Sequence, residues 1–248
     1  MTLPHPVEGS AATKAAAPNP LLNRLLGALP IDIYQGVVLP HLQFVPLHLG
    51  QELYGPGQTL DCVYFPTTAV VSMLCTMENG ASAEMAIVGN DGILGIALFM
   101  GGNSVPNRAV VQIAGAAFRM PGSVLASEFR RGGVFQQLLL RYTQSLIAQM
   151  SQTAACNRLH AVEQRLCRWL LLCHDRLPSN ELVMTQELMG DMLGVTREAV
   201  SLEASRLQHA GLIDYHRGHI TILDRPGLEA RVCECYGVVR RETERLMK

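Results

Sequence analysis

Two short helices joined by a tight turn are predicted by the stretch Thr185-Gln-Glu-Leu-Met-Gly-Asp-Met-Leu-Gly-Val-Thr-Arg-Glu-Ala-Val200. Its apolar residues recur at helical spacing, and Gly194 can supply the left-handed residue that ends the first helix. In a twenty-residue helix-turn-helix frame beginning at Gln186, the small Gly190 and Gly194 and the apolar Val200 take the fifth, ninth and fifteenth places. The stretch therefore predicts a helix-turn-helix.

The second of these helices opens with polar side chains. Thr196 is expected to cap it, and Arg197, Glu198 and Ser201 project from the turns that a helix-turn-helix lays in the major groove of DNA. Taken singly, Arg197 and Glu198 have a plainer interpretation, because a helix start favours glutamate and an exposed arginine is usually a solvated charge. The position and chemistry of the whole group favour DNA binding.

Two alternating strand-like runs follow between Ala210 and Leu223, around a glycine turn at Gly218. They predict a winged helix-turn-helix. His216 and His219 flank the turn and are expected to approach DNA phosphate rather than a metal ion. The complete set predicted to contact DNA is Thr185, Gln186, Thr196, Arg197, Glu198, Ser201, His216 and Arg217.

The tripeptide Thr196-Arg197-Glu198 resembles the Ser/Thr-Arg-Glu start of the recognition helix in the Crp/Fnr family of bacterial transcription regulators. The resemblance covers most of the chain and is strongest in the winged segment. It implies that Arg197 reads a guanine and Glu198 a cytosine. Arginine can bond guanine O6 and N7 together and a carboxylate can accept from cytosine N4, each good pair being worth roughly 1 to 3 kcal/mol of discrimination.

The composition fits a two-domain globular chain. With 248 residues, 48% of them hydrophobic, the chain can fill two cores. No apolar run approaches the roughly 18 residues needed to cross a bilayer, and the amino terminus lacks the pattern of a signal peptide. Seven cysteines without regular spacing indicate reduced thiols. We therefore expect a cytoplasmic protein with no membrane partner.

Charge is distributed unevenly along the chain. Residues 1–130 hold 5 basic and 8 acidic side chains, whereas residues 131–248 hold 15 and 13, and fourteen of those fifteen are arginines. Arginine suits bidentate contact with phosphates and base edges, but the excess is too small for a protein that coats nucleic acid through charge alone. No nucleophile, base and orienting residue can be grouped, so no enzymatic activity and no cofactor are expected.

The predicted fold class is α+β, in four parts: a mobile tail (1–19), an antiparallel β-roll (20–130), a dimerisation helix (131–159) and the winged helix-turn-helix (160–248). By family resemblance the roll is of the cyclic-nucleotide-binding type. Short helices are expected at Leu21–Leu29 and Val162–Arg176, and a closing helix at Pro226–Met247. The expected strands are Val37–Leu39, Phe44–Leu47, Cys62–Phe65, Ala69–Cys75, Ser82–Val88, Ala109–Ile113 and Ala116–Met120.

The dimerisation helix is predicted from Val134 to about Leu159. Its apolar stripe, spaced by three or four residues, consists of Phe135, Leu139, Tyr142, Leu146 and Met150, and Leu138 and Ile147 widen it. Near-heptad spacing, and the need to read a palindromic operator, favour a parallel homodimer seam. The alternative is a helix that packs on its own β-roll.

The residues that bind cyclic nucleotides in the family are altered in this chain. A ribose-binding Gly-Glu pair is matched by Gly95-Ile96, and a phosphate-binding Arg-Ser/Thr-Ala triplet by Asn107-Arg108-Ala109. A slip of one residue in a strand would turn Arg108 to the opposite face. Cyclic AMP is therefore not the expected effector. If an effector binds at this position, the candidate residues are Gly95, Asn107, Arg108 and Ala109.

Three possibilities for the roll stay open from the sequence: an unfamiliar anionic messenger, an apolar effector near Met85, Ile87 and Leu98, or no ligand at all. The run Gly89-Asn-Asp-Gly-Ile-Leu-Gly95 could suggest a phosphate cradle. It lacks the glycine spacing and the following lysine of a P-loop, so a tight turn between strands is favoured.

No metal site is predicted. Cys233 and Cys235 fall in the expected closing helix, where residues two apart point in different directions. Cys167 and Cys173 also have poor spacing for chelation. The iron-sulfur branch of the family carries cysteines near its amino terminus, whereas the first cysteine here is Cys62.

Two functions from different classes are compatible with these patterns: a dimeric transcription regulator with RNA polymerase as a further partner, and a protein-interaction module whose winged helix contacts protein. Arg197 and Glu198 favour the first, because a protein-binding wing needs no reader of guanine and cytosine. Leu202 and Glu203 stand where many members carry another base-reading side chain. We therefore expect an operator that differs from that of the cAMP receptor protein.

Overall fold

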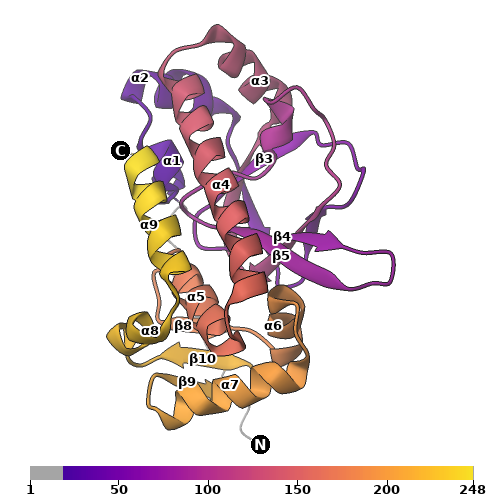
Figure 1. The fold of residues 1–248 in the computed structure, drawn as a ribbon. Helices are drawn as coiled ribbons and strands as arrows, with labels where there is room; N and C mark the ends of the chain where they lie inside the picture. Colours follow the sequence, from indigo (N-terminus) through magenta and orange to yellow (C-terminus); the bar gives the residue numbers. More distant parts are fainter. Residues whose placement is uncertain (1–18, 248) are drawn as a thin grey trace, which may run out of the picture.

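The computed structural model describes residues 19–247, in which one long helix, α4 (Val134–Leu159), joins an N-terminal β-roll to C-terminal helices and a small sheet (Figure 1). The fold combines helices with antiparallel sheets, as the sequence predicts. The predicted tail, residues 1–19, lies outside the described residues except for Asn19. Within the described part of the chain, no helix is long and apolar enough to cross a membrane.

Short antiparallel strands form the roll. One sheet has the order β1-β7-β3 and the other the order β2-β6-β4-β5. Their bounds are β1 Gln43–Leu47, β2 Glu52–Tyr54, β3 Cys62–Pro66, β4 Val70–Thr76, β5 Ser82–Val88, β6 Arg108–Ile113 and β7 Gly115–Pro121. Alternate side chains of the sheets, such as Val63, Phe65 and Val71, meet in a shared core.

The predicted strands are confirmed except for Val37–Leu39, and β2 was not predicted. Residues 37–39 are helical instead, at the junction of η2 (Tyr34–Val38) and η3 (Leu39–His41). Val38 is buried while Leu39 is 42% exposed. Only one side of this segment meets the core, and its backbone continues the helical course of α2 (Ile31–Ile33).

The remaining elements around the roll are short helices. The predicted helix Leu21–Leu29 is divided by Asn23, whose buried amide donates to the carbonyls of Pro66 and Gly92, each at 2.8 Å. The helices are η1 Pro20–Leu22, α1 Arg24–Gly27, η4 Ile96–Leu98 and α3 Gly122–Arg131.

Helix α4 packs its main apolar stripe on its own β-roll. The side chains of Phe135, Leu139, Tyr142 and Leu146 are at most 5% exposed within the roll's core, and Met150 packs against the same core. The Tyr142 hydroxyl donates to the carbonyl of Ile93 at 3.1 Å. The assignment of these residues to a dimer seam is therefore wrong, because the stripe already has an intramolecular partner.

The segment after α4 shares a second core with the roll. Helix α5 (Val162–His174) buries Trp169 and Leu170 against Val70 and Ile87 of the β2-β6-β4-β5 sheet. The Trp169 Nε1 donates to the carboxylate of Glu84 in β5 at 3.4 Å. Burial raises the pKa of Glu84 above its usual range. Residues on either side of position 160 are thus packed together rather than joined by a free linker.

The run Gly89–Gly95 forms the predicted turn, and the turn holds an arginine. Asp91 receives two hydrogen bonds from the guanidinium of Arg176, with N–O distances of 2.7 and 3.0 Å. The side chains of Arg176 and Asp91 are only 5% and 13% exposed. This buried bidentate pair ties the roll to the end of α5.

The winged helix-turn-helix and two closing helices complete the chain. Their bounds are β8 Glu181–Val183, α6 Gln186–Leu193, α7 Arg197–His209, β9 Ile213–His216, β10 His219–Ile222, α8 Arg225–Arg231 and α9 Glu234–Leu246. The expected single closing helix is broken at Val232 and Cys233, where the backbone is extended. Helix α9 returns alongside α4 (Figure 1).

Candidate nucleic-acid interface

Helix α6 has the local structure that the sequence predicts. The Thr185 hydroxyl accepts a hydrogen bond from the backbone N–H of Leu188 at 3.2 Å, which satisfies a free donor of the first turn. The helix ends at Gly194, whose φ of 60° and ψ of 42° are left-handed. The turn that follows directs the chain into α7.

Gly190 allows α6 and the following turn to approach closely. A Cβ atom at this position would lie 2.9 Å from the carbonyl oxygen of Val195 and 3.5 Å from the backbone nitrogen of Arg197. Because both neighbours are backbone atoms, they cannot rotate away as a flexible side chain would. A side chain here must push the two helices apart.

We therefore expect Gly190→Val to destabilise the protein by about 2 kcal/mol or more, as other overpacked positions do, and to abolish the geometry of the helix pair. Urea unfolding followed by circular dichroism measures the loss. Gly36→Ala, where an added Cβ meets no atom within 4 Å, is the matched control and should leave stability almost unchanged. Equal stability of the Gly190 variant would contradict the close approach.

Helix α7 presents its first turn to solvent. The Thr196 hydroxyl caps it by accepting from the backbone N–H of Ala199 at 3.3 Å. Arg197 and Glu198 are exposed, and neither forms an ion pair within residues 19–247. On the opposite face, Val200 and Leu207 are completely buried. The core therefore fixes which side of the helix is free to meet a ligand.

A shallow, open hollow follows the exposed face of α7. It brings together four side chains of the predicted DNA-binding set, from both helices of the motif. Two further residues, Leu202 and Ser205, lie on the same face but were not predicted. Ser205 is one helical turn beyond Ser201, so its spacing could have identified it. The hollow is lined by Gln186, Arg197, Glu198, Ser201, Leu202 and Ser205.

The wing is a three-stranded sheet in the order β8-β10-β9, of which β8 was not predicted. Arg217 and Gly218 form its turn with φ angles of 50° and 85°. His216 and Arg217 are exposed. The backbone N–H of Tyr215 donates to the side chain of Gln208 in α7 at 3.1 Å, which fixes the wing relative to the helix.

The four residues proposed for an effector do not converge on one ligand position. Ala109 is completely buried in the core, and the space beside Gly95 is filled by Val63 and Cys62. Arg108 donates to the carboxylate of Glu52 on the neighbouring strand at 2.6 Å.

The fourth residue, Asn107, is buried, and its side chain lies beside the hydroxyl of Tyr54. Among the side chains considered for an apolar effector, Met85 and Leu98 pack against the core of the roll. Ile87 instead belongs to the second core, against α5. These three side chains therefore do not line one site either.

Residues 164–231 match the Crp-like helix-turn-helix domain family. The segment is a Crp-like helix-turn-helix domain. It contains α6, α7 and the wing, so the resemblance inferred from Thr196-Arg197-Glu198 is confirmed for this part of the chain. No curated protein sequence matches the chain.

Solved structures extend the likeness to the whole Crp-like fold. FixK2 from Bradyrhizobium japonicum has a TM-score of 0.67 at 19% identity, over 77% of this chain and 98% of that protein. A CRP-family transcriptional regulator from Thermus thermophilus has a TM-score of 0.61 at 18% identity, covering 75% and 95%. The c-di-GMP-responsive regulator CLP from Xanthomonas campestris has 0.58 at 14%, covering 76% and 97%. The arrangement of roll, long helix and winged domain is thus that of Crp/Fnr regulators.

Proposed function

We propose that this protein is a sequence-specific DNA-binding transcription regulator of the Crp/Fnr type. The observation that carries the proposal is the exposed Arg197 and Glu198 at the capped start of α7, within a Crp-like helix-turn-helix. A helix presented in this way fits the major groove of DNA. There the guanidinium can bind the O6 and N7 atoms of a guanine, and the carboxylate can accept from the N4 atom of a cytosine.

The wing would contact the DNA backbone beside the recognition helix. Arg217 and His216 are exposed at its tip, and the Gln208 hydrogen bond holds the wing in a fixed relation to α7. Contacts of this kind position a protein without reading sequence. Arg217 therefore supplies affinity in this proposal, whereas Arg197 supplies specificity.

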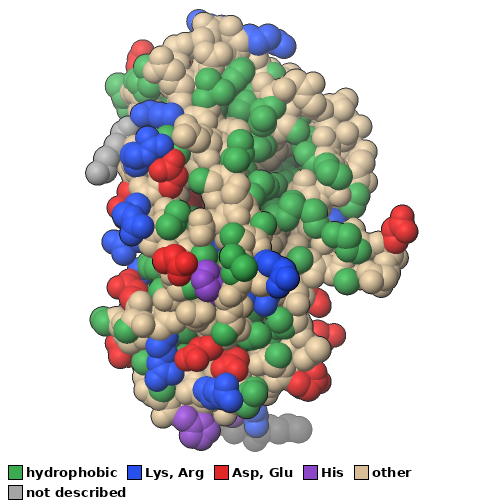
Figure 2. All heavy atoms as spheres, viewed as in Figure 1, with side chains coloured by type: hydrophobic (Ala, Val, Ile, Leu, Met, Phe, Trp, Pro, Cys, Tyr) green, Lys and Arg blue, Asp and Glu red, His purple; other side chains and the backbone are tan. Residues whose placement is uncertain are grey.

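A homodimer would read a palindromic operator. Its two chains would meet along a second stripe of α4, on a different face from the one that packs on the roll. Leu140 and Ile147 are 50% and 54% exposed, and spacings of four and three residues place Gln144, Ser151 and Ala154 in line with them. The stripe carries no charge, although a helix face in water is normally charged. Figure 2 shows hydrophobic side chains exposed over this face. A second copy of α4 is the proposed occupant, and heptad spacing suits such a pair.

Cyclic AMP is not part of this proposed function, because the residues at the ribose and phosphate positions of the family are altered and do not converge on one position, and Arg108 pairs with Glu52. As a regulator of bacterial genes, the protein would act in the cytoplasm, with RNA polymerase as the further partner expected from the resemblance.

Selection of bound sequences from random DNA tests the proposal. The purified protein should enrich an inverted repeat whose half-site centres lie about 34 Å apart, one turn of DNA. Enrichment of no sequence, or of a site without symmetry, would contradict it. A winged helix that contacts protein instead would give no enrichment.

We expect Arg197→Ala to relax the preference at one base pair in each half-site by roughly 1 to 3 kcal/mol. Arg217→Ala should weaken binding to all sequences alike. It should also reduce the slope of log binding constant against log salt concentration by about 1, because about one counterion fewer is released. Fluorescence anisotropy with operator variants at several salt concentrations separates the two effects. Arg231→Ala, an exposed arginine paired with Glu163 at 3.0 Å outside the hollow, is the matched control. A uniform loss for Arg197→Ala would rule out base reading.

A further inference from the structure

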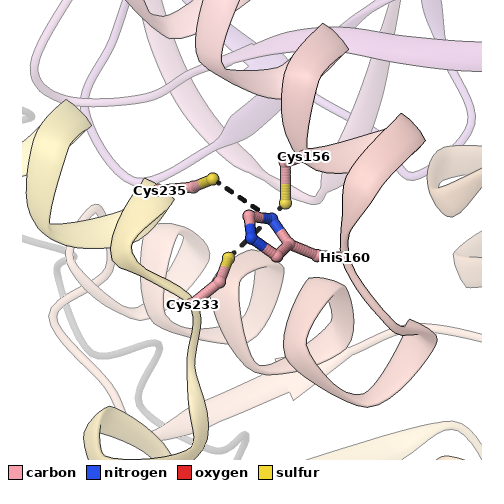
Figure 3. Close-up of side chains that lie close together, drawn as sticks. All are labelled: Cys156, His160, Cys233 and Cys235. Atoms are coloured by element: carbon pink, nitrogen blue, oxygen red, sulfur yellow. Dashed lines mark hydrogen bonds between the residues drawn. The ribbon is translucent and has the colours of Figure 1, made fainter.

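Three cysteines and a histidine meet where α4 ends and α9 begins (Figure 3). Cys156 and His160 come from the end of α4 and the residue after it, and Cys233 and Cys235 from the start of α9. The three cysteines are at most 3% exposed, and the His160 side chain is 18% exposed. The three sulfur atoms and a ring nitrogen of His160 all lie within 4.8 Å of one another.

The break between α8 and α9 is what makes this meeting possible. Cys233 is not in a helix: its φ of −71° and ψ of 163° are extended, and it occupies the N-cap of α9. Cys235 is in the first turn of α9. The reason for excluding a metal site, that Cys233 and Cys235 diverge on one helix, is therefore wrong.

Two distances within the cluster are close to the edges of a tetrahedral zinc site, and the remaining ones are no longer than 4.8 Å. With Zn–S bonds of about 2.3 Å and Zn–N bonds of about 2.0 Å, the edges of a tetrahedron are about 3.8 Å between sulfurs and about 3.5 Å between sulfur and nitrogen. The Sγ atoms of Cys156 and Cys233 are 3.6 Å apart. The Sγ of Cys235 and the Nδ1 of His160 are 3.4 Å apart. We propose that Cys156, His160, Cys233 and Cys235 form a structural Cys3His site for Zn²⁺.

Neighbouring side chains support the ligands. The Nδ1 of His160 faces Cys235, while its Nε2 lies 3.4 Å from the carboxylate of Glu234. A metal-binding histidine commonly donates its other ring N–H to a carboxylate in this way. The side-chain amide of Gln152 lies 3.1 Å from the Sγ of Cys235 and can donate to it. A thiolate is a better acceptor for such a bond than a thiol.

The charge around the cluster also suits a zinc–thiolate centre. Three thiolates and a neutral imidazole around Zn²⁺ carry a net charge of −1. Arg165 and Arg168 are 8% and 4% exposed, and neither has a carboxylate within salt-bridge distance in residues 19–247. Their Nε atoms are buried without a hydrogen-bond partner within that range. Glu84 also lies within electrostatic reach of Arg168, and Cys156 lies within electrostatic reach of both arginines. Buried cations need a compensating negative charge, to which the thiolates of the centre would contribute.

Zinc binding would link the chain just before the winged helix-turn-helix segment to the chain just after it. Each cysteine releases its thiol proton as its sulfur bonds Zn²⁺, so three protons pass to solvent and no electrons are transferred. The ion then links the end of α4, just before α5, to the chain that returns after the wing. The site does not depend on the proposed DNA binding, and its test makes no use of DNA.

Metal analysis of the full chain, purified under reducing conditions and desalted, tests the proposal. We expect about one zinc per chain, retained in native mass spectrometry. Co²⁺ added alone to the metal-free protein should give the visible bands of a tetrahedral thiolate complex. Cys156→Ser and Cys233→Ser should lose both signals, with circular dichroism recording that each variant is folded.

Cys75→Ser is the matched control, because this half-buried thiol lies in β4 outside the cluster. It should keep the zinc and the Co²⁺ spectrum. Glu234→Gln should keep the spectrum but weaken zinc binding by about tenfold, the effect of losing an outer carboxylate. Absence of both stoichiometric zinc and the Co²⁺ bands from the folded protein would overturn the proposal. A mass deficit of two hydrogens mapped to a Cys156–Cys233 disulfide would overturn it as well.

Discussion

The double variant Leu140→Glu/Ile147→Glu should be a folded monomer that binds a palindromic operator at least about a hundredfold more weakly than the wild type. Loss of the second recognition helix removes one half of the base contacts, and linked binding exceeds either single affinity by roughly 10² to 10⁴. Both side chains are about half exposed in the single chain, so the substitutions leave the core intact. Like charges facing each other across the seam would oppose pairing.

Analytical ultracentrifugation gives the oligomeric state, and fluorescence anisotropy gives the operator affinity. Leu49→Glu, a 45% exposed leucine in the turn between β1 and β2, is the matched control and should remain dimeric. A dimeric double variant would show that the Leu140–Ile147 stripe is not the seam. If the wild-type protein itself were a monomer, the proposed homodimer would be wrong.

Replacing Asp91 by Asn should lower the free energy of unfolding by about 3 to 5 kcal/mol. The Asp91 carboxylate holds the guanidinium of Arg176 through two hydrogen bonds, and the Arg176 side chain is only 5% exposed. Without the carboxylate, a buried cation loses its counter-charge. Since this pair joins the roll to the end of α5, we expect the contact between the two cores to loosen first. Urea unfolding measures the loss, and hydrogen exchange locates it.

A second substitution separates the charge effect from a simple loss of packing. Adding Arg176→Met to Asp91→Asn removes the unpaired cation and should recover part of the stability, because buried ion pairs can be replaced by apolar groups at little cost. Glu52→Gln breaks the exposed Arg108–Glu52 pair, with side chains 37% and 40% exposed. It should cost less than about 1 kcal/mol. If Glu52→Gln and Asp91→Asn lowered the free energy of unfolding by similar amounts, burial would not be the reason why the Asp91–Arg176 pair matters for stability.

Local patterns were sufficient for the helix-turn-helix and for most strands. Caps, a left-handed glycine and apolar spacing act within a few residues of the chain, so Thr196 and Gly194 could be placed from the sequence. The strands β1 and β3 to β7 followed from alternation between turn residues in the same way. Strands β2 and β8, with three residues each, are too short to show a period.

The face of α4 that meets each partner could not be predicted. Helical spacing shows that Phe135, Leu139, Tyr142 and Leu146 form a stripe, but the same spacing results from packing on a second helix or on a sheet. The structure assigns this stripe to the β-roll and leaves Leu140 and its heptad neighbours exposed. Whether a stripe is buried depends on the element that packs against it, and the spacing of residues along one helix carries no information about that element.

Interactions within a few residues account for the capped helices, the left-handed turn at Gly194 and the polar start of α7, so the order of amino acids was enough to predict them. The contacts between distant segments became known only from the folded chain. Asp91 meets Arg176, and Cys156 meets Cys233 from 77 residues away. Those contacts arise when separate apolar faces pack together, and a one-dimensional pattern does not specify which faces become neighbours.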